Sequence, residues 1–305
     1  MPSKPGPAAP TGPTGRFAPS PTGDLHFGSL VAAVASFLEA KSRGGQWLVR
    51  IEDIDPPREV AGSAERILAA LQAFGLRSDR PVVFQSQRTA AYRAARDRLL
   101  AEGKAFWCGC SRADLPASGV YPGTCRSGLP AGKSPRSVRL RVDDATVRFR
   151  DAIQGEISEH LPATVGDFVI WRADDLPAYQ LAVVVDDAWQ GVDECVRGHD
   201  LLASTARQIQ VARALGLSVP RYAHHPVATT PDGRKLAKRL RSDPLERQAR
   251  GATLRLALDL LGQRPPTGLT LAELWRWALS HWRLDRVPRR AAVEMPPAER
   301  GARVR

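Results

Sequence analysis

The chain has 305 residues, 43% of them hydrophobic, which is enough to bury the core of one large or two moderate domains. No apolar run approaches the roughly 20 residues that span a bilayer, and the N-terminus lacks the apolar core of a secretion signal, so we expect a cytoplasmic protein. The formal net charge of +12 has two interpretations, a polyanionic partner such as RNA or solubility alone.

Residues 1–14 are mainly Pro, Gly, Ala and Thr, which predicts a disordered tail. Positive charge gathers elsewhere in the chain. Two segments rich in Lys and Arg, residues 234–250 and 283–305, are candidate RNA-facing surfaces.

Residues 15–41 (GRFAPSPTGDLHFGSLVAAVASFLEAK) predict a strand, a glycine-bearing turn and a one-sided helix, and the apolar run at 47–51 predicts a second strand. In such a βαβ unit the turn lies at the carboxyl end of the first strand, where ligands bind. The helix N-terminus favours an anion such as a nucleotide phosphate beside His26, Gly28 and Ser29. The alternative is that Ser29 caps the helix and His26 is a surface residue.

Further helices are predicted at residues 59–74 and 88–101, each followed by a glycine. The sequence then changes character. Alternating segments at 137–144 and 145–153 predict antiparallel strands with one solvated face. We therefore expect a β-rich insertion between two halves of a nucleotide-binding fold.

Three of the four cysteines crowd into CGCSRADLPASGVYPGTC, and a cytoplasmic location disfavours disulfides. Cys108, Cys110 and Cys125 could converge as thiolates on one zinc ion. A reduced, metal-free loop is the alternative, and the spacing alone favours neither. Cys195, isolated in an apolar strand, is expected in the core.

Residues 167–172 and 177–187 are apolar runs of strand length, and the second predicts a fully buried parallel strand. A strand near 192–198 then leads into a helix at 200–215, so that a second strand-to-helix turn faces the first. Helical patterns continue beyond residue 243.

Several blocks, taken in order, resemble the class I aminoacyl-tRNA synthetases. HFGS at 26–29 stands where that family has its HIGH motif, and KLAKR at 235–239 resembles its KMSKS loop. RFAPSPTGDLHFG followed by RIEDID at 50–55 is similar to the glutamyl branch, as is RGHDLL at 197–202. Ser29 replaces a second histidine, and the KLAKR loop lacks the serines, so its lysine roles carry over better than any hydroxyl role.

The resemblance implies an α/β fold: a Rossmann-type parallel sheet with an inserted, zinc-bearing β-rich subdomain, a short C-terminal helical region and no anticodon-binding domain. The expected organisation has five segments: the disordered tail (1–14), the first half of the catalytic domain (15–103), the inserted subdomain (104–164), the second half with the KLAKR loop (165–242) and the helical C-terminal region (243–305).

The resemblance also implies the site residues. It implies an ATP site formed by His26, Gly28, Ser29, Lys235 and Lys238. In that site Mg²⁺ is shared among the phosphates, and His26 and Lys238 act in catalysis. It also implies a glutamate pocket formed by Arg16, Ala18, Ser20, Glu52, Tyr179 and Arg197. In that pocket Arg16 and Arg197 bind the side-chain carboxylate of glutamate, and Glu52 binds its α-ammonium group. Alternatively, Arg16, Glu52 and Arg197 form structural ion pairs. Tyr121 is the implied fourth ligand of one structural zinc, beside Cys108, Cys110 and Cys125.

Three functions follow as hypotheses. The favoured one is a shortened relative of the glutamyl synthetases, acting as a monomer, that activates L-glutamate with ATP and transfers it to queuosine in the anticodon stem-loop of tRNA(Asp). The second is a compact glutamyl-tRNA synthetase that charges the 3′ end, which the expected lack of an anticodon domain disfavours. The third is a non-catalytic RNA-binding module, which the retained glutamate pocket disfavours.

Overall fold

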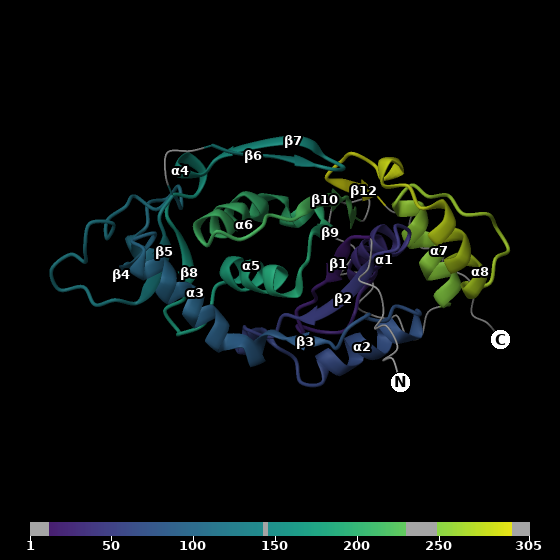
Figure 1. The fold of residues 1–305 in the computed structure, drawn as a ribbon, viewed down its shortest axis with the longest axis horizontal. Coiled ribbons are helices and arrows are strands. Elements are labelled where there is room, and N and C mark those ends of the chain that lie inside the picture. Colours follow the sequence, from purple (N-terminus) through teal and green to yellow (C-terminus); the bar gives the residue numbers. More distant parts are fainter. Residues whose placement is uncertain (1–11, 143–145, 230–248, 295–305) are drawn as a thin grey trace, which may run out of the picture.

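The chain folds around a seven-stranded sheet with the strand order β3-β2-β1-β9-β10-β6-β7, seen in a computed structural model that describes residues 12–142, 146–229 and 249–294 (Figure 1). Neighbouring strands from β3 to β6 are parallel, and β7 is antiparallel to β6. The seven strands are β1 (Thr14–Phe17), β2 (Gln46–Ile51), β3 (Val83–Phe84), β6 (Thr146–Asp151), β7 (Gly155–His160), β9 (Glu194–Gly198) and β10 (Arg221–His225).

Two hydrophobic cores lie on the two faces of this sheet, because side chains alternate between the faces along each strand. In β9 and β10, Val196 and Ala223 belong to one core, whereas Cys195 and Tyr222 belong to the other. The helices that cover the first core are α1 (Phe27–Lys41), α2 (Ser63–Ala73), α7 (Arg250–Leu260) and α8 (Leu271–His281). The helices that cover the second are α3 (Thr89–Ala101), α5 (Tyr179–Gln190) and α6 (Leu202–Ala214).

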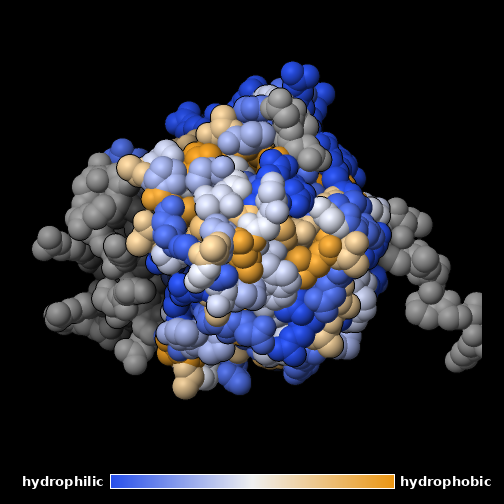
Figure 2. Space-filling view, turned by 90° about the vertical axis from the view of Figure 1, so that its left-hand side faces the viewer, coloured by the Kyte–Doolittle hydropathy of each residue, from blue (hydrophilic) through white to orange (hydrophobic). Residues whose placement is uncertain are grey.

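A separate three-stranded antiparallel sheet lies at the end of the molecule opposite α7 and α8 (Figure 1). Its strands, in the order β4-β5-β8, are β4 (Ala105–Cys108), β5 (Ser137–Leu140) and β8 (Phe168–Trp171). Figure 2 shows that end of the molecule as mostly hydrophilic, with hydrophobic residues in separate patches. β11 (Val227–Thr229), which directly follows β10, pairs in parallel with β12 (Ala292–Glu294) of the C-terminal region. This two-stranded sheet joins the C-terminal region to the end of β10.

The remaining elements are short. They are α4 (Leu161–Thr164) and the 3-10 helices η1 (Pro56–Arg58), η2 (Gln85–Arg88), η3 (Arg112–Asp114), η4 (His199–Leu201) and η8 (Leu284–Arg286). Among the described residues, no helix is both long enough and apolar enough to cross a membrane.

The first βαβ unit is confirmed as β1, α1 and β2, with its turn at the carboxyl end of β1. Gly44, with φ +71°, ends the helix in the left-handed region that glycine tolerates. At Gly45 a Cβ atom would lie 2.0 Å from the carbonyl oxygen of Pro13, so only glycine lets the chain pass this close to the start of β1. Cys195 is fully buried in β9, as expected.

Two expectations are wrong. Residues 177–187 do not form a buried parallel strand, because from Tyr179 onward they are helix α5, which ends at Gly191 with φ +69°. An apolar run of this length fits either a buried strand or a buried helix, and packing of α5 against α6, α3 and β8 selects the helix. The segments at 137–144 and 145–153 do not pair with each other either: β5 lies in the small sheet, and β6 pairs with β7 and β10.

Some sequence predictions fall outside the described residues. The KLAKR segment at 235–239, with Lys235 and Lys238, is one of them, as are residues 1–11 of the tail. The same holds for most of the basic segment at 234–250 and for residues 295–305 of the second one.

Candidate active site

A cleft of about 740 Å³ opens at the carboxyl ends of β1 and β9, beside the N-terminus of α1. This is the edge of a parallel sheet at which α/β proteins bind ligands. The cleft brings together eight of the predicted site residues, namely Arg16, Ala18, Ser20, His26, Gly28, Ser29, Tyr179 and Arg197. Glu52 lies in an adjoining pocket of about 170 Å³ that shares Ser20 and Tyr179 with the cleft.

The N-terminus of α1 is capped by His26, not by Ser29 as the alternative interpretation had it. The His26 Nδ1 accepts a hydrogen bond from the backbone N–H of Ser29 at 3.2 Å. The proton of a neutral ring is therefore on Nε2, which lies 3.0 Å from the Ser29 hydroxyl. The histidine and the serine are thus held together at the positive end of the helix dipole, facing the cleft.

Beneath the cleft floor, Arg16 is held by Asp187, a residue of α5 that the sequence analysis had assigned no role. The carboxylate accepts hydrogen bonds from Arg16 Nε at 3.2 Å and Nη2 at 3.3 Å, and from Arg50 Nη1 at 2.7 Å. Arg50 also donates to Gln190 at 2.7 Å and to Glu52 at 3.3 Å. Although burial opposes its ionisation, Arg16 and Arg50 lower the pKa of Asp187, so this carboxylate is charged.

Asp186 forms the other half of this buried network. It accepts hydrogen bonds from Arg88 at 2.6 Å, from the Tyr92 hydroxyl at 2.6 Å and from Gln85 at 2.8 Å. The sequence carries a signal that could have revealed both acids: two adjacent carboxylates at the end of an apolar run require buried cations as partners.

Arg197, on β9, differs from Arg16 because no carboxylate of the described residues pairs with it. Its Nε donates to His224 Nε2 at 2.9 Å, and its Nη2 donates to the Thr205 hydroxyl at 2.8 Å. Its Nη1 is buried and has no hydrogen-bond partner among the described residues. The guanidinium is 3% exposed and lines the cleft, so it presents an uncompensated cation there.

Two further polar groups, Tyr179 in the cleft and Glu52 in the adjoining pocket, interact electrostatically with these arginines. Burial and the nearby Glu52 carboxylate raise the pKa of Tyr179 to about 12, so its hydroxyl stays protonated at neutral pH. Burial also raises the pKa of Glu52 itself, although Arg50 and Arg16 favour its charged form. A cleft lined by a buried arginine, with a carboxylate in the adjoining pocket, complements a zwitterion that carries a second carboxylate.

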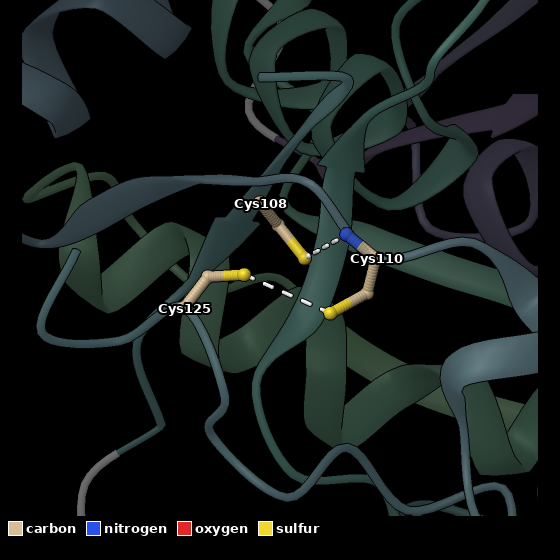
Figure 3. Close-up of side chains that lie close together, drawn as sticks. All are labelled: Cys108, Cys110 and Cys125. Atoms are coloured by element: carbon tan, nitrogen blue, oxygen red, sulfur yellow. Dashed lines mark hydrogen bonds between the residues drawn. The ribbon is translucent and has the colours of Figure 1, made fainter. Parts of the chain in front are cut away.

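The three cysteines of the predicted metal loop are buried and converge, with every sulfur within 4.8 Å of the others (Figure 3). The sulfurs of Cys110 and Cys125 are 3.7 Å apart. Around a tetrahedral zinc with Zn–S bonds of about 2.3 Å, two sulfurs stand about 3.8 Å apart, so the cluster fits this ion. Cys108 is prepared for the thiolate form: burial opposes it, but hydrogen bonds from Tyr121, the Cys110 N–H and Arg139 lower its pKa to about 7.

Tyr121 lies beside the three cysteines. Its hydroxyl oxygen lies 3.5 Å from Cys108 Sγ and accepts a hydrogen bond from the Cys125 N–H at 2.7 Å. The Arg139 guanidinium stacks 3.9 Å from its ring centroid. The oxygen therefore lies beside the sulfurs, at the separation of about 3.5 Å expected between an oxygen and a sulfur that share one zinc.

A sequence model of the family "tRNA synthetases class I (E and Q), catalytic domain" matches residues 14–118 and 126–251. The chain belongs to this family. The class I synthetase fold expected from the sequence is thereby confirmed. It has a mostly parallel sheet, a cysteine cluster at the end of β4 and in the segment between β4 and β5, and helices α7 and α8 in the C-terminal region.

Curated members of this synthetase family resemble the chain over most of its length. A protein of Dechloromonas aromatica (strain RCB) named glutamyl-Q tRNA(Asp) synthetase is 52% identical over 294 residues, which cover 92% of this chain and 98% of that protein. A protein of the same name from Pseudomonas aeruginosa strain PAO1 is also 52% identical, over 94% of this chain and 98% of its own.

Solved synthetase structures share the fold. The crystal structure of glutamate-tRNA synthetase from Elizabethkingia anophelis matches with a TM-score of 0.78 at 26% identity, over 92% of this chain and 68% of that one. A glutamate tRNA ligase from Elizabethkingia meningosepticum, in complex with its amino acid, matches equally well over 92% of this chain and 66% of that one.

Proposed function

We propose that this synthetase-family protein activates L-glutamate with ATP and transfers it to queuosine in the anticodon of tRNA(Asp). The observation that carries the proposal is the cleft at the carboxyl ends of β1 and β9, which brings Arg197 and a capped helix N-terminus together, with the Glu52 carboxylate in the adjoining pocket. The relatives named for this reaction, which align over 98% of their length, support the choice of acceptor.

In this proposal, Arg197 binds the side-chain carboxylate of glutamate through Nη1, which has no hydrogen-bond partner among the described residues. Arg16 lines the same cleft, but Asp187 already accepts two of its hydrogen bonds, so its charge is largely compensated. Glu52 takes the α-ammonium group, and Tyr179 adds a hydroxyl contact, with Ala18 and Ser20 at the pocket wall.

Activation is attack of the ionised α-carboxylate on the α-phosphate of ATP, which releases pyrophosphate and leaves glutamyl-adenylate. The nucleophile is already charged, so the protein needs no general base and contributes alignment and charge stabilisation. The positive end of the α1 dipole at Gly28, the Ser29 hydroxyl and the His26 ring suit phosphate binding at the start of α1, while the Ser29 N–H donates to His26. Lys235 and Lys238, outside the described residues, supply cations by family resemblance, and Mg²⁺ when bound neutralises the phosphates.

Transfer then requires a hydroxyl nucleophile. A hydroxyl of the queuosine cyclopentene-diol attacks the adenylate carbonyl, the glutamyl ester forms and AMP leaves. Anticodon-loop bases suit such recognition, because unpaired bases can be splayed out and stacked while Lys and Arg contact the phosphates.

Zinc in this proposal is structural. One ion is bound by Cys108, Cys110, Cys125 and Tyr121, and it stiffens the loop between β4 and β5 without contacting the substrates. We further propose that the protein works as a monomer in the cytoplasm, with the five-segment organisation given above, except that the first catalytic segment begins at Thr14, the first residue of β1, and not after it.

The first test is pyrophosphate exchange into ATP, measured with the purified protein without tRNA. We expect exchange that depends on glutamate and that is much weaker with aspartate or glutamine, because aspartate is one methylene shorter and glutamine lacks the charge that would pair with Arg197. Exchange that requires tRNA, or that runs equally with all three amino acids, would contradict the pocket assignment. No exchange under any condition would favour the non-catalytic RNA-binding module.

A further inference from the structure

Three buried side chains form a chain of hydrogen bonds that ends at the cleft. Asp151, His224 and Arg197 lie on β6, β10 and β9, which are neighbours in the main sheet. Asp151 Oδ2 is 2.5 Å from His224 Nδ1, and His224 Nε2 is 2.9 Å from Arg197 Nε. Asp151 is 1% and His224 0% exposed, so only Arg197 reaches the cleft.

The chemistry of Arg197 fixes the tautomer of His224. A guanidinium can only donate hydrogen bonds, so His224 Nε2 must be the bare, accepting nitrogen and the ring proton must be on Nδ1. That proton is donated to Asp151 Oδ2. The other oxygen, Oδ1, accepts the backbone N–H groups of His224, Ile153 and Gln154, so the carboxylate cannot rotate. Burial lowers the pKa of His224 to about 4, which keeps the ring neutral at pH 7.

A neutral acceptor has a different consequence for an arginine than a carboxylate does. Asp187 bonds Arg16 directly and compensates its charge. His224 orients Arg197 through its Nε, yet it keeps the Asp151 carboxylate one imidazole ring away from the guanidinium. Nε and Nη2 of Arg197 are thus occupied by uncharged acceptors, and Nη1 is left for a ligand.

We propose that His224, held by Asp151, is a positioning residue that fixes the Arg197 guanidinium for a side-chain carboxylate in the cleft and so sets the selectivity for glutamate. The identity of the carboxylate ligand rests on the proposed function, whereas the tautomer and its effect on Arg197 do not.

The sharpest perturbation is Asp151→Asn, which keeps the shape. Because Oδ1 accepts three N–H groups, the new amide nitrogen takes the Oδ2 position and donates to His224 Nδ1. The ring proton is then forced to Nε2, where it faces the N–H of Arg197, so the hydrogen bond between the two side chains is lost. A carboxylate-to-amide change imposes the wrong histidine tautomer in a catalytic triad in the same way. His224→Phe removes the acceptor and keeps a flat ring against Tyr222, whereas His224→Gln keeps an acceptor oxygen.

In the exchange assay we expect Asp151→Asn and His224→Phe to raise the KM for glutamate by about tenfold or more, with the KM for ATP nearly unchanged. His224→Gln should recover part of the loss. The matched control is Asp193→Asn, the same change at an exposed carboxylate at the opposite end of β9, which should alter neither KM. Variants that fold and keep the wild-type KM for glutamate would overturn the inference.

A second measurement does not depend on activity or on the folding of a variant. Side-chain ¹⁵N NMR of the wild-type protein without substrates should show His224 neutral and protonated at Nδ1. Protonation at Nε2, or a charged ring at pH 7, would overturn the inference even if the protein proves to be a synthetase. Absence of glutamate exchange by the wild type would instead contradict the proposed function, and the tautomer would still report on the positioning of Arg197.

Discussion

Replacing Asp187 with asparagine tests whether the buried charges beneath the cleft hold it in shape. The wild-type carboxylate is 5% exposed and bonds two guanidinium groups, of Arg16 and Arg50, that are 4% and 0% exposed. The amide is isosteric but carries no charge, so it leaves two cations buried with too few counter-charges. Removal of one partner from a buried ion pair costs about 3 to 5 kcal/mol of unfolding free energy.

For a chain of this length, that loss corresponds to a fall in Tm of about 5 to 8 °C, given an unfolding entropy of about 2.1 cal/mol/K per residue. The assay is denaturant and thermal unfolding of the wild type and the variant at pH 7. Asp285→Asn is the control, because its partner Arg283 is 60% exposed and the pair is solvated, so we expect no measurable change. Equal effects of the two substitutions would refute the reasoning.

The pH dependence of the same difference provides an internal check. Arg16 and Arg50 hold the pKa of Asp187 below its ordinary value despite burial. Its stabilising contribution is therefore complete above the unfolded value of about 3.9 and is lost as the pH falls through the depressed folded value. The gap between the wild type and Asp187→Asn should be full at pH 7 and should narrow only in strong acid.

Three further predictions concern other parts of the molecule. Arg197→Ala should weaken glutamate binding by about 2 to 5 kcal/mol, measured by calorimetry, whereas the exposed Arg213→Ala on α6 should not, and equal losses would return Arg197 to a structural role. Metal analysis should find one zinc ion per chain in the wild type. The variant Cys125→Ser should lose this ion, whereas the control Cys195→Ser should retain it. Full zinc retention by Tyr121→Phe would show that the tyrosine is not a ligand. Burial lowers the pKa of His224 from 6.5 to about 4, so as the pH falls this histidine is protonated in the unfolded state before it is protonated in the folded state. The wild type should therefore lose about 3 kcal/mol of unfolding free energy between pH 6.5 and pH 4. The variant His224→Phe, which has no histidine at this position, should not show this loss.

The first βαβ unit could be predicted because its signals are local. The spacing of apolar residues in α1, the glycines that end it and the strand that follows are all set within about 40 residues of sequence. The cysteine loop was different: its spacing allowed convergence but favoured neither interpretation, and only the resemblance to the glutamyl branch favoured a zinc site. The N-cap could not be predicted, because histidine is not among the usual capping side chains and only the fold shows that its ring reaches the Ser29 N–H.

The parts that could not be predicted depend on contacts between distant segments. The apolar run that forms α5 is compatible with a strand until the helices around it are placed. Asp187 and Arg16 are 171 residues apart in sequence, so their pairing is a property of the assembled sheet and helix layer. His224 carried no motif, and its role follows from the register that sets it beside Arg197 across β9 and β10.

The measurement that tests the central claim most directly is the position of glutamate on RNA after the reaction. Enzyme, ATP and labelled glutamate are incubated separately with queuosine-containing tRNA(Asp), with unmodified tRNA(Asp) and with tRNA(Glu), and each RNA is then cut into fragments. The proposed function predicts label only on the anticodon fragment of queuosine-containing tRNA(Asp). Label on the 3′-terminal fragment of tRNA(Glu) would contradict it and would identify a compact glutamyl-tRNA synthetase instead.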